Sequence, residues 1–127
     1  MSLRLAVDRD SVAAGDDCES HRAEVVVEAT CTVAELVAAA RRACPLAGIQ
    51  GGKATWIVDV GGAVREAIAV VAEQWLEPKL LIASTTNAAT LFADREPAVF
   101  FRYWCQADPD AVFTALRDGR ALPSRYG

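Results

Sequence analysis

The chain has 127 residues, of which 53% are hydrophobic and 24% are charged, and its formal net charge is −4 at pH 7. That length suits one domain, and the composition is typical of a globular protein rather than a disordered one. The acidic balance argues against nucleic-acid binding, and no apolar run is long enough for a signal peptide or a membrane span. We therefore expect a single cytoplasmic domain over residues 1–127, without nucleic-acid or membrane partners. Eleven arginines against two lysines favour a bacterial origin.

Two strands separated by an acidic loop are predicted at the start of the chain. Arg4 to Val7 predict a short first strand, and residues 8–22 are rich in aspartate and glutamate, which favours an exposed loop. Residues 23–31 then alternate, with alanine, valine and cysteine on one face and glutamate and threonine on the other. A period of two is typical of a half-buried strand.

A helix is predicted directly after this second strand. Thr32 can act as the N-cap, and Glu35 three residues later completes a capping box. Apolar residues follow at helical spacing, and Pro45 ends the helix. The segment that begins Thr-Val-Ala-Glu-Leu-Val is similar to the start of the helix in β-grasp (ubiquitin-like) proteins, a resemblance confined to this part of the chain.

The Gly61-Gly62 pair allows two interpretations. As a tight turn it joins a strand over Thr55–Val60 to another strand that runs through Ile68. As a helix start it opens a helix over residues 63–76, whose apolar residues also fit helical spacing. No capping residue precedes that segment, and Ile-Ala-Val-Val favours extended structure, so we favour the hairpin.

The last part of the chain predicts strands around one dense apolar run. A further strand is expected over Leu80–Ala83, then a short helical turn over Ala88–Phe92, and then the apolar strand Val99–Cys105. Asp108 caps a final helix that has Pro109 in its first turn and ends near Gly119. Residues 120–127 are expected to form a frayed tail.

These elements predict an α+β fold. We expect a mostly antiparallel sheet of five to six strands, one helix after the second strand and a C-terminal helix. If residues 63–76 were helical, the alternative would be an α/β sheet.

The cysteines suggest structural thiols. Cys18, Cys31, Cys44 and Cys105 are expected to stay reduced and to pack as small apolar side chains. Cys18 and His21 are weak candidates for zinc ligands, with Cys31 and Cys44 completing a set, but the remaining spacings match no common zinc site. We therefore expect no metal or other cofactor. A Cys18–His21 dyad lacks an oxyanion-hole motif, which makes an enzyme the less favoured interpretation.

Aromatic residues are the stronger candidates for binding. Trp56, Trp75 and Trp104 come from strands expected to be neighbours, and their first role is core packing. The alternative is that some of them line a pocket or an interface. Phe100, Arg102 and Trp104 fall on one face of the dense strand, and aromatic and arginine side chains are enriched at binding hot spots.

Three functions remain open from the sequence. The first is a non-catalytic protein-interaction or assembly module, with self-association as one form. The second is a small-molecule-binding domain with a pocket between helix and sheet, lined by Trp56 and Trp75. The third is a metal- or cysteine-dependent enzyme that uses Cys18, His21 and the acidic loop. We favour them in that order.

Overall fold

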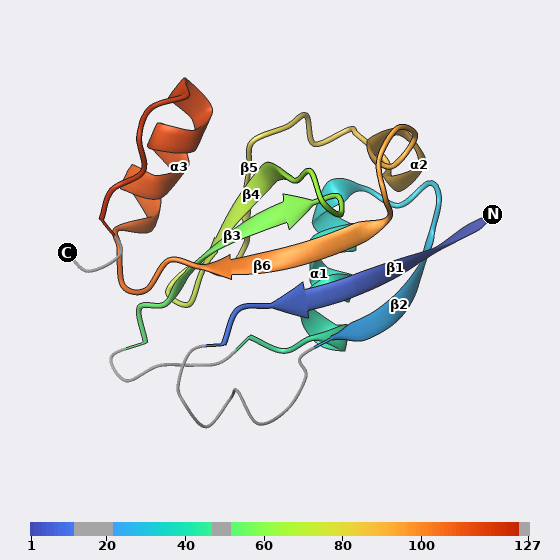
Figure 1. Ribbon diagram of the computed structural model, residues 1–127, viewed down its shortest axis with the longest axis horizontal. Coiled ribbons are helices and arrows are strands. Elements are labelled where there is room, and N and C mark those ends of the chain that lie inside the picture. The colour runs from blue at the N-terminus through green and yellow to red at the C-terminus, as the bar shows by residue number, and fades with distance from the viewer. Residues whose placement is uncertain (12–21, 47–51, 125–127) are drawn as a thin grey trace.

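The computed structural model in Figure 1 describes residues 1–11, 22–46 and 52–124. Six strands form one mixed sheet in the order β2-β1-β6-β3-β4-β5. Strands β1 and β6 run parallel, and all other neighbouring strands are antiparallel. The strands are β1 (Ser2–Arg9), β2 (Ala23–Glu28), β3 (Thr55–Val60), β4 (Glu66–Ala72), β5 (Lys79–Leu80) and β6 (Ala98–Tyr103).

This topology confirms the predicted α+β fold with a mostly antiparallel sheet of six strands. An N-terminal hairpin is followed by a helix, and the first strand lies parallel to the last one in the middle of the sheet. Among the described residues, none of the helices has the length and apolar character needed to cross a bilayer.

Helix α1 (Val33–Ala43) lies behind the sheet in Figure 1 and covers one of its faces. Its predicted capping box is present: the Glu35 N–H donates to the Thr32 hydroxyl, and the Glu35 carboxylate accepts from the Thr32 N–H at 3.0 Å. The apolar stripe of α1 packs on inward-facing residues of β1, β3 and β6, among which Trp56 and Phe101 are the largest fully buried side chains. This layer is the main core.

Helix α3 (Pro109–Asp118) packs on the opposite face of the sheet. Asp108 caps it, Pro109 occupies its first turn, and Gly119 ends it in the left-handed conformation with φ 67°, as predicted. Its Val112 forms a second, smaller cluster with Ile57 and Val70, which alternate along β3 and β4 with residues of the main core. The sheet is therefore covered by α1 on one face and by α3 over part of the other (Figure 1).

The hairpin interpretation of Gly61-Gly62 is confirmed, because β3 and β4 pair antiparallel and residues 66–72 are extended. The turn is longer than the two-residue connection expected, since β4 begins only at Glu66. Gly61 has φ 107°, and a Cβ there would lie 2.3 Å from the Val64 carbonyl oxygen. Both the backbone angle and the close approach require glycine.

Several predicted boundaries differ from the structure. Strands β2 and β6 end at Glu28 and Tyr103, before the predicted ends at Cys31 and Cys105. Strand β5 covers only Lys79–Leu80, not Leu80–Ala83, because the chain turns away to the short helix α2 (Ala88–Leu91), whose Asn87 bridges to Thr32. Strand β1 runs to Arg9, so the expected acidic loop does not begin at residue 8. Residues 120–124, expected in a frayed tail, pack beside the small cluster through Leu122.

Candidate functional site

The candidate site lies on the far face of the sheet, which is the face opposite α1. Strand register places residues from five strands on this face. One end of the far face, over β3 and β4, is covered by α3; the other end, over β1, β2 and β6, is not covered by any described element. The residues on the far face are Arg4, Ala6 and Asp8 of β1, Glu24 and Val26 of β2, Phe100 and Arg102 of β6, Ile57 and Asp59 of β3, and Val70 of β4.

The covered half is a small apolar cluster. Ile57, Val70 and Val112 have no exposed surface, Ala107 joins them, and six partly buried apolar side chains pack around the cluster. Trp104 closes this cluster on the C-terminal side, where its indole N–H donates to the Pro123 carbonyl oxygen at 2.8 Å. The half under α3 is therefore a structural core.

An ion pair between Asp59 and Arg102 separates the covered half from the open half. Arg102 Nη2 donates to Asp59 Oδ1 at 3.2 Å, and Arg102 Nε lies 3.1 Å from Oδ2 without hydrogen-bond geometry. Asp59 is 3% exposed. Burial raises the pKa of its carboxyl, and the Arg102 charge opposes that rise. The pair is thus a partly buried charge pair in the middle of the far face.

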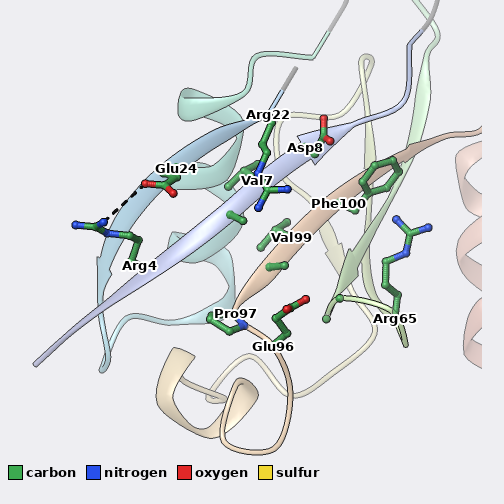
Figure 2. A pocket seen from close by; sticks show the side chains of 14 residues that line it. Arg4, Val7, Asp8, Arg22, Glu24, Arg65, Glu96, Pro97, Val99 and Phe100 are labelled. Carbon is green, nitrogen blue, oxygen red and sulfur yellow. Dashed lines mark ion pairs between the residues drawn. The ribbon is translucent and has the colours of Figure 1, made fainter. Parts of the chain in front are cut away.

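The open half forms a shallow basin of about 560 Å³ between β1, β6 and the turn after β3. Figure 2 shows the side chains that line it, with Arg4 and Arg22 at one end and Arg65 and Glu96 at the other. Arg4 pairs with Glu24 of the neighbouring strand at 3.9 Å. The floor on this face contains Ala6, Ala98 and the ring of Phe100, whereas the side chains of Val7 and Val99 belong to the main core. The basin therefore combines a small apolar floor with a rim of both charge signs.

Arg65 and Phe100 form the most specific feature of this basin. The Arg65 guanidinium carbon lies 4.3 Å from the centroid of the Phe100 ring, which is a cation–π contact (Figure 2). Among the described residues, Arg4 and Arg102 have carboxylate partners, whereas Arg65 forms no ion pair. Stacking on a ring holds a guanidinium in place while its planar donors stay available to another carboxylate.

The predicted binding residues Phe100, Arg102 and Trp104 share one face, as the alternation of the strand predicted, but they do not form one patch. Phe100 lies in the open basin, Arg102 pairs with Asp59, and Trp104 packs in the covered cluster. All three keep part of their surface exposed. Only Phe100 lines the basin on the open half.

The other two tryptophans lie on opposite faces of the sheet. Trp56 is 1% exposed in the main core, where its ring centroid lies 4.8 Å from that of Tyr103. Trp75 packs against the small cluster, and the Lys79 ammonium lies 4.7 Å from its ring centroid. The structure therefore does not bring Trp56 and Trp75 together around a common pocket.

Cys18 and His21, the weak zinc candidates, lie outside the described residues. Cys44 is buried and Cys31 partly buried, and burial raises the pKa of both thiols, which favours the protonated form. Cys105 lies two residues after the end of β6 and has φ 56°. Within 1–11, 22–46 and 52–124, no group of three or more histidine, cysteine or acidic side chains is arranged to hold a metal ion.

Sequence reasoning predicted the turn at Gly61-Gly62 but missed Arg65, which this turn carries. Its position after Gly61-Gly62 identified a turn, but the identity of the ring beneath Arg65 depends on β6 lying next to β3. That pairing joins residues about forty positions apart and has no local signature. No family model matches the chain, and no curated protein or solved structure matches it either.

Proposed function

We propose that this chain is a non-catalytic protein-interaction module that binds a partner polypeptide through the open half of the far face. The observation that carries the proposal is the Arg65 guanidinium held on the Phe100 ring without an ion pair among the described residues. Arginine and aromatic side chains dominate binding energy at protein interfaces, and a fixed guanidinium favours a bidentate carboxylate.

The chemistry of the basin specifies the partner segment. An aspartate or glutamate of the partner pairs with Arg65, and an apolar side chain next to it packs on Phe100. Arg4 is already balanced by Glu24 at 3.9 Å, so the rim adds polar contacts around the central pair rather than a second strong anion site. We therefore expect an acidic residue flanked by an apolar one, not a long acidic run.

The proposal is tested by selecting a displayed random-peptide library against the full chain. Parallel selections use Arg65→Glu and the matched charge reversal Lys53→Glu, because Lys53 is also exposed but does not line the basin. Peptides recovered with the wild-type chain should contain the expected acidic and apolar pair. Their affinity should fall about tenfold or more for Arg65→Glu and stay unchanged for Lys53→Glu.

Nuclear magnetic resonance locates the bound peptide. Amide shifts should concentrate on β1, β6 and the turn at Gly61–Arg65. Peptides that bind Arg65→Glu as well as the wild-type chain, or that shift only residues on the α1 face, would contradict the proposal.

A small ligand in the same basin is the second candidate. The volume of about 560 Å³ falls within the range of roughly 300–1,000 Å³ that small-molecule sites occupy. Such a site encloses most of its ligand within apolar walls, whereas Phe100 is the one aromatic side chain among the described residues that line this basin. The peptide partner is therefore the better supported of the two.

A further inference from the structure

The edge strand β2 has backbone groups without a strand partner in the described chain. It pairs with β1 on one side, and no described strand lies on its other side. The Ala29 N–H donates to the Met1 carbonyl oxygen at 2.9 Å, so Ala29 and Met1 form a hydrogen-bonded pair of the antiparallel ladder between β1 and β2. Because such pairs alternate along antiparallel strands, the odd-numbered residues of β2 bond to β1. Glu24 and Val26 therefore direct their N–H and C=O groups away from the sheet.

We propose that this edge pairs with β2 of a second copy of the chain, in antiparallel orientation, with the two Val25 residues facing each other on the symmetry axis. The two sheets then become one continuous sheet, with both α1 helices on the same face. The pairing depends on the outer backbone edge of β2, whereas peptide binding depends on Arg65 and Phe100, so each can fail without the other; Arg22 and Glu24 lie at both places.

The side-chain pattern selects this register. With Val25 on the axis, Glu24 lies opposite Val26, and the exposed Arg22 lies opposite Glu28 on the same face. Moving the axis by one residue, to Val26 or to Glu24, places glutamates directly opposite one another. Like charges opposite each other destabilise a strand pair, whereas opposite charges stabilise it. The registers centred on Glu24, Val25 and Val26 all pair the outward N–H and C=O groups of β2. Of these three, only the register centred on Val25 keeps the glutamates apart and places a cation opposite Glu28.

The packing around the edge leaves space for the added strand. A groove of about 370 Å³ runs between α1 and β2 and is lined by Val27, Ala39 and their neighbours. In the proposed register, Ala23 of the second copy lies opposite Val27 on the α1 face, where its small side chain enters this groove beside Ala39. Val26, which is 58% exposed on the far face, becomes partly covered at the same time.

The oligomeric state of the full chain tests this pairing by sedimentation equilibrium between about 1 µM and 1 mM. We expect a dimer for the wild-type chain and a monomer for Val26→Pro. Proline is tolerated where the N–H of an edge strand faces solvent, so this change removes a bond to the second copy and none to β1. Val26→Thr is the matched control, because it keeps the N–H and the branched side chain and should remain dimeric.

A charge exchange tests the register without relying on proline. Arg22→Glu and Glu28→Arg should each weaken the dimer about tenfold, because each places like charges opposite one another in both symmetric pairs. The double variant should recover most of the wild-type affinity. Arg65→Glu, which removes peptide binding under the proposed function, should leave the dimer intact.

Three results would overturn the proposal. One is a wild-type chain that stays monomeric over the whole concentration range. Another is a dimer that persists in a Val26→Pro variant whose circular dichroism matches the wild type. The third is an Arg22→Glu/Glu28→Arg double variant that dimerises no better than either single variant. That result would mean that Arg22 of one copy does not lie opposite Glu28 of the other.

Discussion

The two halves of the far face lie over different strands of one sheet, meet along β6, and differ in what covers them. On β6, Phe100 and the residue that follows the strand, Trp104, point to the same side. Trp104 lies under the C-terminal segment and donates to Pro123, whereas Phe100 lies under a single guanidinium in the open basin. Large aromatic side chains on one strand face thus become core or surface according to where a later segment of the chain packs.

The charge pair Asp59–Arg102 lies where the apolar cover of α3 ends. A helix that covered Asp59 and Arg102 completely would remove both charges from water, and that cost commonly exceeds the gain from their attraction. Arg102 instead keeps about a third of its side chain exposed next to the buried Asp59. The pair therefore marks the limit of the apolar cluster on this face.

The largest difference between the halves should appear when one apolar side chain is removed from each. Ile57→Ala should cost about 2–5 kcal/mol of unfolding free energy, because Ile57 has no exposed surface under α3. Phe100→Ala should cost about 1 kcal/mol or less, since its ring is already partly exposed. Urea denaturation of both variants measures the two values. Similar losses would mean that the basin is as much a core as the covered half.

A somewhat smaller effect is expected at the boundary, and it should depend on pH. Arg102→Met leaves the buried Asp59 carboxylate without its cation, which should cost about 3 kcal/mol at pH 7. Burial holds the pKa of Asp59 above its unfolded value of about 3.9, so the folded state binds this proton more tightly. Stability from this group is therefore present at low pH and is lost as pH rises through the raised pKa.

Removing Arg102 takes away the charge that opposes this rise. The cost of Arg102→Met should consequently shrink as pH falls, because a protonated Asp59 needs no cation. The matched control is the double variant Asp59→Asn with Arg102→Met. It has no carboxyl at position 59, so its unfolding free energy should lack the pH dependence that Asp59 causes in the Arg102→Met variant. Urea denaturation at pH 4, 5.5 and 7 checks this, and a cost that does not change with pH would exclude an ionised Asp59 as its cause.

Local patterns in the sequence predicted the elements that form with near neighbours. The capping box at Thr32, the proline and glycine at the ends of α3 and the alternation of β2 all depend on residues within a few positions. For the same reason the hairpin at Gly61 was predictable, although its length was not. The strand Leu80–Ala83 was predicted too long because the contacts of Thr86 and Asn87 with the start of α1 redirect the chain.

The candidate site was predictable only in part. The face shared by Phe100, Arg102 and Trp104 follows from strand periodicity, but its division into a covered and an open half depends on the position of α3. Arg65 reaches Phe100 because β3 lies between β4 and β6, a pairing between distant segments. Those contacts follow from the tertiary fold and have no sequence pattern of their own.

The smallest of these effects concerns the turn that carries Arg65. Gly61→Ala should cost about 2 kcal/mol, because an alanine must adopt φ 107° with its Cβ against the Val64 carbonyl oxygen. Gly119→Ala is the matched control at the end of α3: φ is also positive there, but no atom lies within 4 Å of the added Cβ, so about 1 kcal/mol is expected. Denaturation curves measure both costs. Only Gly61→Ala should also weaken the selected peptides, because the turn that must relax is the one that positions the guanidinium over Phe100. If both glycine variants bound the peptides like the wild type, the precise position of Arg65 would not matter for recognition, and the open half of the face would act through its overall charge alone.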